Sequence, residues 1–310
     1  MSTGKSEVTV GGRTFHVSNL GKVLYPEVGF TKAQVIDYYV RIAPVLLPHL
    51  KNRPITLKRY PNGVDGFFFY EKRCPSHRPC WVKTAAVARR HKDDETIHYC
   101  VMDDLAALVW AANLANIELH TFLHRAPAVY RPTAVAFDLD PGPPAGVVLC
   151  CQVGLWIKEL LDRFRLEAFP KTSGSKGLQV YVPLNSPVTY ERAKAFAQVI
   201  AIRLEAEHPD VVVSRMAKAA RKGKVFIDWS QNDPAKTTIN VYSLRAKQQP
   251  TVSTPVTWKE IAQCLKKQSG EELTFLCDEV LDRVKRHGDM FKPVLTLKQR
   301  LPALKAVRSG

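Results

Sequence analysis

The segment AVAFDLDPGP, residues 134–143, is apolar apart from two aspartates that stand one residue apart. Side chains alternate along a strand, so Asp138 and Asp140 share one face while Phe137 and Leu139 lie on the other. An unpaired carboxylate is costly to bury, and two side by side cost more. The sequence therefore predicts a strand whose two carboxylates project from one edge of a sheet toward a positively charged partner.

A third aspartate, Asp228, ends the apolar strand in KVFIDWSQN. Hard divalent cations prefer oxygen ligands of this kind. Three aspartates can hold two metal ions about 3.5 to 4 Å apart, the arrangement that serves phosphoryl transfer. For Asp138 and Asp140 taken alone, a strand-end turn or salt bridge is the commoner explanation. The sequence predicts that all three converge on one point as metal ligands.

Basic residues beside these strands favour the metal hypothesis. The turn in KTSGSKGLQVYV offers Ser173, Lys176 and backbone amides freed by glycines, all suited to phosphate oxygens, although the Walker A spacing is absent. Five Lys or Arg occur within residues 215–224, immediately before Asp228. Arg245 adds a guanidinium that can bind phosphate bidentately. Each feature alone is equally a flexible turn or a solvated face, but together they indicate a phosphate-binding site.

The charge of the chain points to a polyanionic partner. Its 310 residues contain 45 Lys and Arg against 29 Asp and Glu, a net charge of +16. Nucleic acid is favoured over an anionic membrane, because no segment is a basic amphipathic helix of the lipid-binding kind. The first 15 residues contain no apolar signal segment. We therefore expect a soluble, cytoplasmic protein that associates with the nucleoid.

The cysteines allow two interpretations. Seven cysteines at irregular spacing argue against a disulfide framework. Cys74, His77 and Cys80 have nearly the spacing of zinc ligands, but no obvious fourth ligand follows nearby. A reduced loop is the favoured interpretation, and a structural zinc site is the alternative.

Strands and helices are interspersed without the strict alternation of a doubly wound sheet. This order predicts an α+β fold with a mixed or antiparallel central sheet flanked by helices. Thr31 caps a helical segment that we expect to be interrupted near Pro44. Thr257 opens a capping box at the start of another helix.

Five segments resemble, in order, the polymerase domain of bacterial ATP-dependent DNA ligase D, a branch of the archaeo-eukaryotic primase superfamily. They are FDLDPG, FPKTSGSKGLQVYVPL, KAARKGKVFIDWSQN, KTTINVYSLRA and TVSTPVTW. The resemblance extends over nearly the whole chain, from VSNLGKVLYPEVGFTK to GDMF. It implies a primase-polymerase-like fold with an N-terminal tail, one catalytic domain and a basic C-terminal tail, at residues 1–12, 13–295 and 296–310.

The resemblance also implies an activity. Members of this family are template-dependent nucleotidyltransferases that extend and fill DNA ends or gaps carrying a downstream 5′-phosphate during double-strand break repair by non-homologous end joining. They use NTPs or dNTPs with a preference for ribonucleotides, bind two Mn²⁺ or Mg²⁺ ions, and work with Ku and an ATP-dependent DNA ligase. Because the sequence has no ligase or nuclease motif, the chain is either a stand-alone polymerase or one domain of a longer protein.

Residue by residue, the resemblance assigns four kinds of site. The catalytic metal ligands are Asp138, Asp140 and Asp228. The nucleotide-binding positions are Lys58, His120, Ser173, Lys176, Gln179, Gln231 and Arg245. The positions that hold the DNA 5′-phosphate are Asn19, Lys22 and Lys32, and an aromatic pair that stacks on a template base falls at Phe69 and Tyr70.

One position departs from the family pattern S-G-x-K-G-x-H, because Gln179 stands where the histidine is expected. Glutamine donates a hydrogen bond but carries no charge. The alternative function is therefore a catalytically weakened module that binds 5′-phosphorylated DNA ends and recruits Ku and ligase. The intact carboxylates favour the enzyme, and a metal-dependent nuclease would have no use for a triphosphate site. We expect Gln179 and Tyr181 to share the strand face that is turned toward Asp138.

Overall fold

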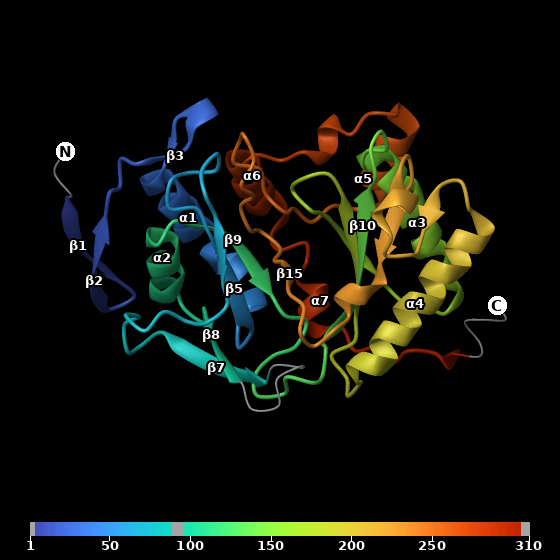
Figure 1. Cartoon of the computed structure of the whole chain (residues 1–310), viewed down its shortest axis with the longest axis horizontal. Helices are drawn as coiled ribbons and strands as arrows, with labels where there is room; N and C mark the ends of the chain where they lie inside the picture. The colour runs from blue at the N-terminus through green and yellow to red at the C-terminus, as the bar shows by residue number, and fades with distance from the viewer. Residues whose placement is uncertain (1–3, 89–95, 305–310) are drawn as a thin grey trace. The chain divides into compact units, whose positions relative to one another are not determined.

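A computed structural model describes residues 4–88 and 96–304 (Figure 1). The chain forms two compact units, each built from three separate stretches of sequence. The first unit comprises Met1–Pro127, Thr237–Val252 and Leu276–Gly288, and the second comprises Ala128–Lys236, Ser253–Phe275 and Asp289–Gly310. Helices and mostly antiparallel strands occur in both, so the α+β class predicted from the sequence is confirmed.

The first unit is organised around a sheet of order β15-β9-β5-β8-β7, with β6 paired to β5. Every pairing in this sheet is antiparallel. Its strands are β5 (Pro54–Arg59), β6 (Phe69–Glu71), β7 (Lys83–Ala88), β8 (Thr96–Val101), β9 (Asn116–Thr121) and β15 (Thr238–Ile239). Two small ribbons, β1 (Lys5–Val10) with β2 (Arg13–Ser18) and β3 (Val23–Tyr25) with β4 (Phe30–Thr31), belong to the same unit, as do helices α1 (Lys32–Leu50), α2 (Leu105–Asn113) and α6 (Cys277–His287).

Helix α1 begins at the predicted cap. Thr31 and Gln34 form a reciprocal capping box that satisfies the first backbone donors. The predicted interruption near Pro44 is wrong, because α1 continues through it to Leu50. A proline inside a helix removes one backbone hydrogen bond. Burial of the apolar face on both sides of the proline, including Ile42 and Leu46, compensates for that loss.

The second unit contains a sheet of order β11-β12-β10-β14-β13, in which only the last pair is parallel. Its strands are β10 (Ala134–Pro141), β11 (Phe169–Thr172), β12 (Leu178–Pro183), β13 (Val212–Val213) and β14 (Val225–Asp228). The helices of the unit are α3 (Val147–Arg163), α4 (Tyr190–Glu207), α5 (Trp258–Lys267) and the short α7 (Pro293–Thr296). Apolar side chains of α3, α4 and α5 form one core with one face of the sheet, which leaves the other face for polar residues.

One boundary prediction needs correction. Residues 5–10, expected to be part of a tail, form β1 and pair with β2 along their whole length. Residues 13–295, expected to form the catalytic domain, contribute to both compact units. In the expected C-terminal tail, the Gln299 amide bonds to the backbone of Glu167 and Pro183, so this part of the tail packs on the second unit. Residues 305–310 lie outside the described ranges.

The cysteine prediction is also corrected. Cys74 and Cys100 form a disulfide in the first unit, whereas a reduced loop was expected. Cys74 donates its backbone N–H to the carbonyl of His98 in β8, which places it beside Cys100 of the same strand. Cys80 is an exposed free thiol. With Cys74 in a disulfide, the Cys74, His77 and Cys80 zinc hypothesis loses one of its three ligands.

None of the helices within the described residues combines the length and the apolar character that a membrane crossing requires.

Candidate active site

A row of four polar side chains crosses the sheet of the second unit. The strand register places Lys171 opposite Gln179, Gln179 opposite Asp138, and Asp138 opposite Asp228. Directly opposite residues have Cβ atoms about 4.5 to 5.5 Å apart, so their side chains interact. Alternate residues on the same strands, such as Leu178 and Val180, lie in the core. The sheet thus brings two predicted metal ligands and one predicted nucleotide-binding residue onto one face.

The charges of the aspartates act on one another. Burial, followed by the nearby Asp140 carboxylate, raises the pKa of Asp138 to about 7. A hydrogen bond from Gln179 and the charge of Lys171 act in the opposite direction on the same pKa. Asp228 adds to the repulsion from the opposite strand. A cation placed among these carboxylates would reverse the pKa shift, which is the behaviour expected of metal ligands.

Asp228 is held in place by the turn that follows it. One carboxylate oxygen accepts the backbone N–H of Ser230 at 2.9 Å. The other accepts the amide of Gln231 at 3.2 Å and lies 4.0 Å from the Lys236 ammonium. Gln231, which the resemblance assigns to the nucleotide, therefore contacts a predicted metal ligand directly. The hydrogen bond from Gln231 holds the Asp228 carboxylate in one orientation at the end of β14.

The three aspartates fit hard divalent cations by donor type, since each offers only carboxylate oxygens. Asp138 and Asp228 are directly opposite, and Asp140 lies two residues along the same strand face. Among the described residues, no group of three or more His, Cys, Asp or Glu side chains is close enough to hold a metal ion. The convergence of all three carboxylates on one point therefore stays a prediction.

Two glycines allow other segments to approach the aspartate strand closely. A Cβ atom at Gly177 would lie 2.2 Å from the carbonyl oxygen of Leu139, and one at Gly142 would lie 1.8 Å from that of Arg221. Both distances are far below van der Waals contact, so only glycine fits. The Gly142 N–H also donates to Lys224. The basic segment 215–224 is thereby fixed beside the end of β10, as its position in the sequence indicated.

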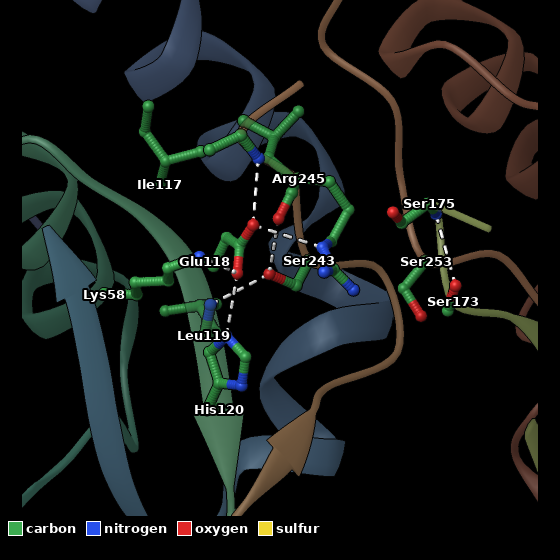
Figure 2. Close-up of polar contacts among 12 residues, drawn as sticks. Lys58, Ile117, Glu118, Leu119, His120, Ser173, Ser175, Ser243, Arg245 and Ser253 are labelled. Atoms are coloured by element: carbon green, nitrogen blue, oxygen red, sulfur yellow. Dashed lines mark hydrogen bonds and ion pairs between the residues drawn. The ribbon is translucent and has the colours of Figure 1, made fainter. Parts of the chain in front are cut away.

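Ser173 is occupied differently from the prediction. Its hydroxyl oxygen accepts the backbone N–H groups of Ser175 at 3.2 Å and Gly177 at 3.1 Å (Figure 2 draws the first of these). Two of the backbone amides that the sequence suggested for phosphate, those of Ser175 and Gly177, are therefore bonded within the turn. Lys176 is exposed at the tip of the same turn.

In the first unit, three predicted nucleotide-binding residues surround one carboxylate (Figure 2). Glu118 accepts hydrogen bonds from Arg245 Nε at 3.2 Å and His120 Nε2 at 2.8 Å, and the Lys58 ammonium lies 3.5 Å from it. The backbone N–H of Ala246 donates to it as well, at 3.0 Å. The structure thus brings together Lys58, His120 and Arg245, which lie far apart in the sequence.

The residues predicted to hold a 5′-phosphate also lie together in the first unit. Asn19, in the left-handed conformation at φ 53°, turns the chain so that its carbonyl accepts the N–H of Lys22. Lys32 is buried, and its ammonium donates to the carbonyl of Ser18 at 2.6 Å. Burial, the charge of Lys22 and that of Arg59 lower the pKa of Lys32 to about 8. A phosphate bound here would relieve this repulsion.

The predicted aromatic pair is not presented on one face. Phe69 and Tyr70 are adjacent in β6, so their side chains point to opposite sides. Tyr70 is 52% exposed, whereas the guanidinium of Arg59 lies over the Phe69 ring at 5.2 Å. Phe68, 45% exposed, makes an edge contact with Tyr70. The exposed aromatic residues of this segment are thus Phe67, at 73%, Phe68 and Tyr70.

Sequence reasoning missed two charged residues, Glu118 and Lys171. Both are 1% exposed and stand within mainly buried strands, NIELHT and FPKT. The Lys171 ammonium donates to the Ser253 hydroxyl at 2.7 Å. The signal that identified Asp138, a charge within a buried strand, could have identified both.

We expect Gln179→Leu to lower the free energy of unfolding at pH 8 by about 1 to 3 kcal/mol, because Asp138 loses a donor in buried surroundings. Gln179→His retains a ring N–H, so it should preserve more stability and, as the resemblance implies, tighten nucleotide binding. Urea unfolding measures the first effect. Tyr181→Phe is the matched control, since it removes the hydroxyl that donates to Gln179 at 3.4 Å and leaves the Gln179 amide in place. Unchanged stability in Gln179→Leu would show that the amide does not support Asp138.

Comparison with known proteins agrees with this geometry. A family model for the primase-polymerase domain of LigD matches residues 31–291. The multifunctional non-homologous end joining protein LigD of Mycolicibacterium smegmatis is 42% identical over 285 residues, which cover 90% of this chain and 36% of that protein. The bifunctional non-homologous end joining protein LigD of Bacillus subtilis is 31% identical over 275 residues, covering 88% and 43%. The chain thus spans less than half the length of these curated relatives.

A solved structure supports the same assignment. The polymerase domain of Mycobacterium tuberculosis ligase D, in complex with DNA, matches with a TM-score of 0.83 and 40% identity over 91% of this chain and 98% of that one. Its likeness agrees with the α+β architecture described above. The resemblance found in the sequence is confirmed: the chain belongs to the LigD primase-polymerase domain family, a family of DNA nucleotidyltransferases that acts in non-homologous end joining.

Proposed function

We propose that this chain fills gaps and extends DNA ends carrying a downstream 5′-phosphate, by template-dependent transfer of nucleotides with two divalent metal ions. The observation that carries the proposal is the pairing of Asp138 with Asp228 across adjacent strands, with Asp140 on the same face. Asp140 and Asp228 both raise the pKa of Asp138, and carboxylates crowded in this way are arranged for a cation rather than for a salt bridge.

Each group of residues has a separate task in this mechanism. Asp138, Asp140 and Asp228 would hold two Mn²⁺ or Mg²⁺ ions, which when bound lower the pKa of the attacking 3′-hydroxyl and stabilise the leaving pyrophosphate. Gln179 and Gln231 orient the carboxylates through their amides. The positive charges of Lys58 and Arg245 in the first unit neutralise the triphosphate as it binds, with His120 beside them.

The DNA end is recognised through its phosphate and its exposed bases. Asn19, Lys22 and Lys32 hold the 5′-phosphate, a contact that positions the duplex without sequence preference. The exposed ring of Tyr70 accepts a template base by stacking. The structure of the solved relative is a complex with DNA, which supports DNA as the partner.

The resemblance supports the remaining parts of the proposal, which are a preference for ribonucleotides, recruitment by Ku, and joining of the filled ends by an ATP-dependent ligase. The relatives are named as multifunctional or bifunctional end-joining proteins, and this chain matches about a third to two fifths of their length. The ligase step is accordingly assigned to a separate region or partner.

Primer extension on a gapped duplex tests the proposal. A labelled primer is extended with NTPs or dNTPs, with Mn²⁺ or Mg²⁺, opposite a downstream strand that carries or lacks a 5′-phosphate. We expect the primer to be extended until the gap is filled. Extension should be strongest with the 5′-phosphate, Mn²⁺ and ribonucleotides. Tight binding of phosphorylated ends without extension under any condition would instead favour the end-binding module.

A further inference from the structure

Glu118 is a buried carboxylate that the sequence did not single out. It lies in the middle of β9 with only 2% of its side chain exposed. Burial alone would raise its pKa, but the hydrogen bond from His120 and the charges of Arg245, His120 and Lys58 bring the pKa of Glu118 well below its usual value. The carboxylate is therefore ionised in the folded protein, and its contacts explain why.

Both oxygens of Glu118 are fully engaged. Oε1 accepts Arg245 Nε at 3.2 Å and the backbone N–H of Ala246 at 3.0 Å. Oε2 accepts His120 Nε2 at 2.8 Å and lies 3.5 Å from the Lys58 ammonium. The donors come from β5, from β9 and from the segment after β15, so one side chain joins three separate parts of the chain (Figure 2). A buried carboxylate with this many partners fixes their relative positions.

The cluster has more positive than negative charge. Lys58 and Arg245 carry two positive charges against one on Glu118, since burial lowers the pKa of His120 below its usual value. The Lys58 ammonium also lies over three aromatic rings, closest to Phe68 at 4.5 Å. These contacts hold the ammonium at one place. The cluster is thus a pre-arranged cationic group with one internal carboxylate.

We propose that Glu118 is a positioning residue for the incoming nucleotide, which holds Lys58, His120 and Arg245 in the arrangement that binds the triphosphate. The inference rests on the proposed function, in which these three residues contact the nucleotide. Pre-arranged donors lose less entropy on binding than flexible ones. Glu118 itself, with both oxygens occupied, does not contact the ligand.

The sign of one measurement separates positioning from simple electrostatics. If Glu118 only dilutes the positive charge, neutralising it should strengthen triphosphate binding, because a nearby negative charge is removed. If Glu118 positions the three residues, neutralising it should weaken binding despite the more positive local charge. The two accounts predict changes in opposite directions.

The experiment measures the affinity of the full chain for ATP and for inorganic tripolyphosphate by calorimetry. We expect Glu118→Gln to weaken binding of both probes by about 10-fold, the loss of roughly one charge-assisted hydrogen bond. Glu118→Asp keeps the charge on a shorter side chain, so its affinity for both probes should lie between those of the wild type and Glu118→Gln. Glu71→Gln is the matched control, because Glu71 pairs with Arg59 at 3.0 Å in the same sheet but does not contact the cluster. It should leave both affinities unchanged.

Steady-state kinetics adds a second readout. Glu118→Gln should raise the KM for nucleotide more than it lowers kcat, and leave the affinity for gapped DNA unchanged. In a Lys58→Gln background, Glu118→Gln should cost less than it does alone, because part of its effect passes through Lys58. If Glu118→Gln fails to fold by circular dichroism, Glu118→Asp carries the same test, because it keeps the charge and changes only the position of the carboxylate.

The outcomes distinguish this inference from the proposed function. Triphosphate binding that depends on Glu118, in a protein that does not extend primers, would support the inference and contradict the function. Primer extension with unchanged or tighter nucleotide binding in Glu118→Gln would overturn the inference and leave the function standing. Failure of the wild-type protein to bind either probe would contradict both.

Discussion

Replacing Asp138 or Asp140 with alanine is expected to reduce primer extension below detection while the protein stays folded. The loss follows from the assignment of these carboxylates to the metal ions that both activate the nucleophile and stabilise the leaving group. Asp162→Ala is the control, because Asp162 is an exposed carboxylate of α3 in the same unit that pairs only with Lys158, one turn away. Extension at the wild-type rate by either active-site variant would rule out the assignment.

The same aspartate gives an expectation for stability. The pKa of Asp138 is about 7 in the folded protein against an ordinary value of 3.8, so ionising it costs the folded state stability as the pH rises between these values. In Asp138→Asn this cost disappears. The free energy of unfolding of the variant minus that of the wild type should therefore be larger at pH 8 than at pH 4. Urea unfolding at the two pH values provides the measurement, and a parallel dependence in both proteins would contradict the pKa.

Lys32→Met is expected to weaken binding to gapped DNA with a 5′-phosphate by on the order of 10- to 100-fold, through loss of a charged donor. Binding to the same DNA without the phosphate should change little. The pKa of Lys32 is about 8, so the wild-type preference for the phosphate should decline as the pH rises above 8 and the ammonium loses its proton. Fluorescence anisotropy with the two DNAs measures both effects.

Lys51→Met is the control for this prediction, since Lys51 is an exposed lysine at the end of α1 in the same unit. It should reduce affinity for both DNAs slightly and equally, as general electrostatic attraction does. An equal loss on both DNAs in Lys32→Met would mean that Lys32 too contributes only such attraction.

Local patterns in the sequence predicted the parts of the site that depend on strand alternation. The common face of Asp138 and Asp140, the core on the opposite face, and the common face of Gln179 and Tyr181 all follow from a period of two residues. The opposition of Asp138 to Asp228 could not be predicted in this way. It depends on which strands pair and in which register, and these are set by tertiary packing.

The missed and mistaken features have the same origin. Glu118 binds residues 60 positions before it and 127 positions after it, so nothing in its own strand reveals its partners. The disulfide between Cys74 and Cys100 likewise depends on the pairing that brings two distant segments together. Helix propensity alone predicts a break at Pro44, but burial of the apolar face of α1 outweighs that propensity. Family resemblance supplied roles for residues, but it supplied none for Glu118.

The interleaved order of the two units has a consequence for biosynthesis. The first unit takes its strand β15 and helix α6 from residues 237–252 and 276–288, after most of the second unit has been synthesised. Arg245, one of the donors to Glu118, belongs to the first of these late segments. Until the ribosome has passed residue 245, the first unit lacks its edge strand β15, and Glu118 lacks one of its positive charges. The cluster around Glu118 can therefore be completed only after residues 128–236 of the second unit have been synthesised, and a chain that stops near residue 236 would leave the carboxylate buried without Arg245.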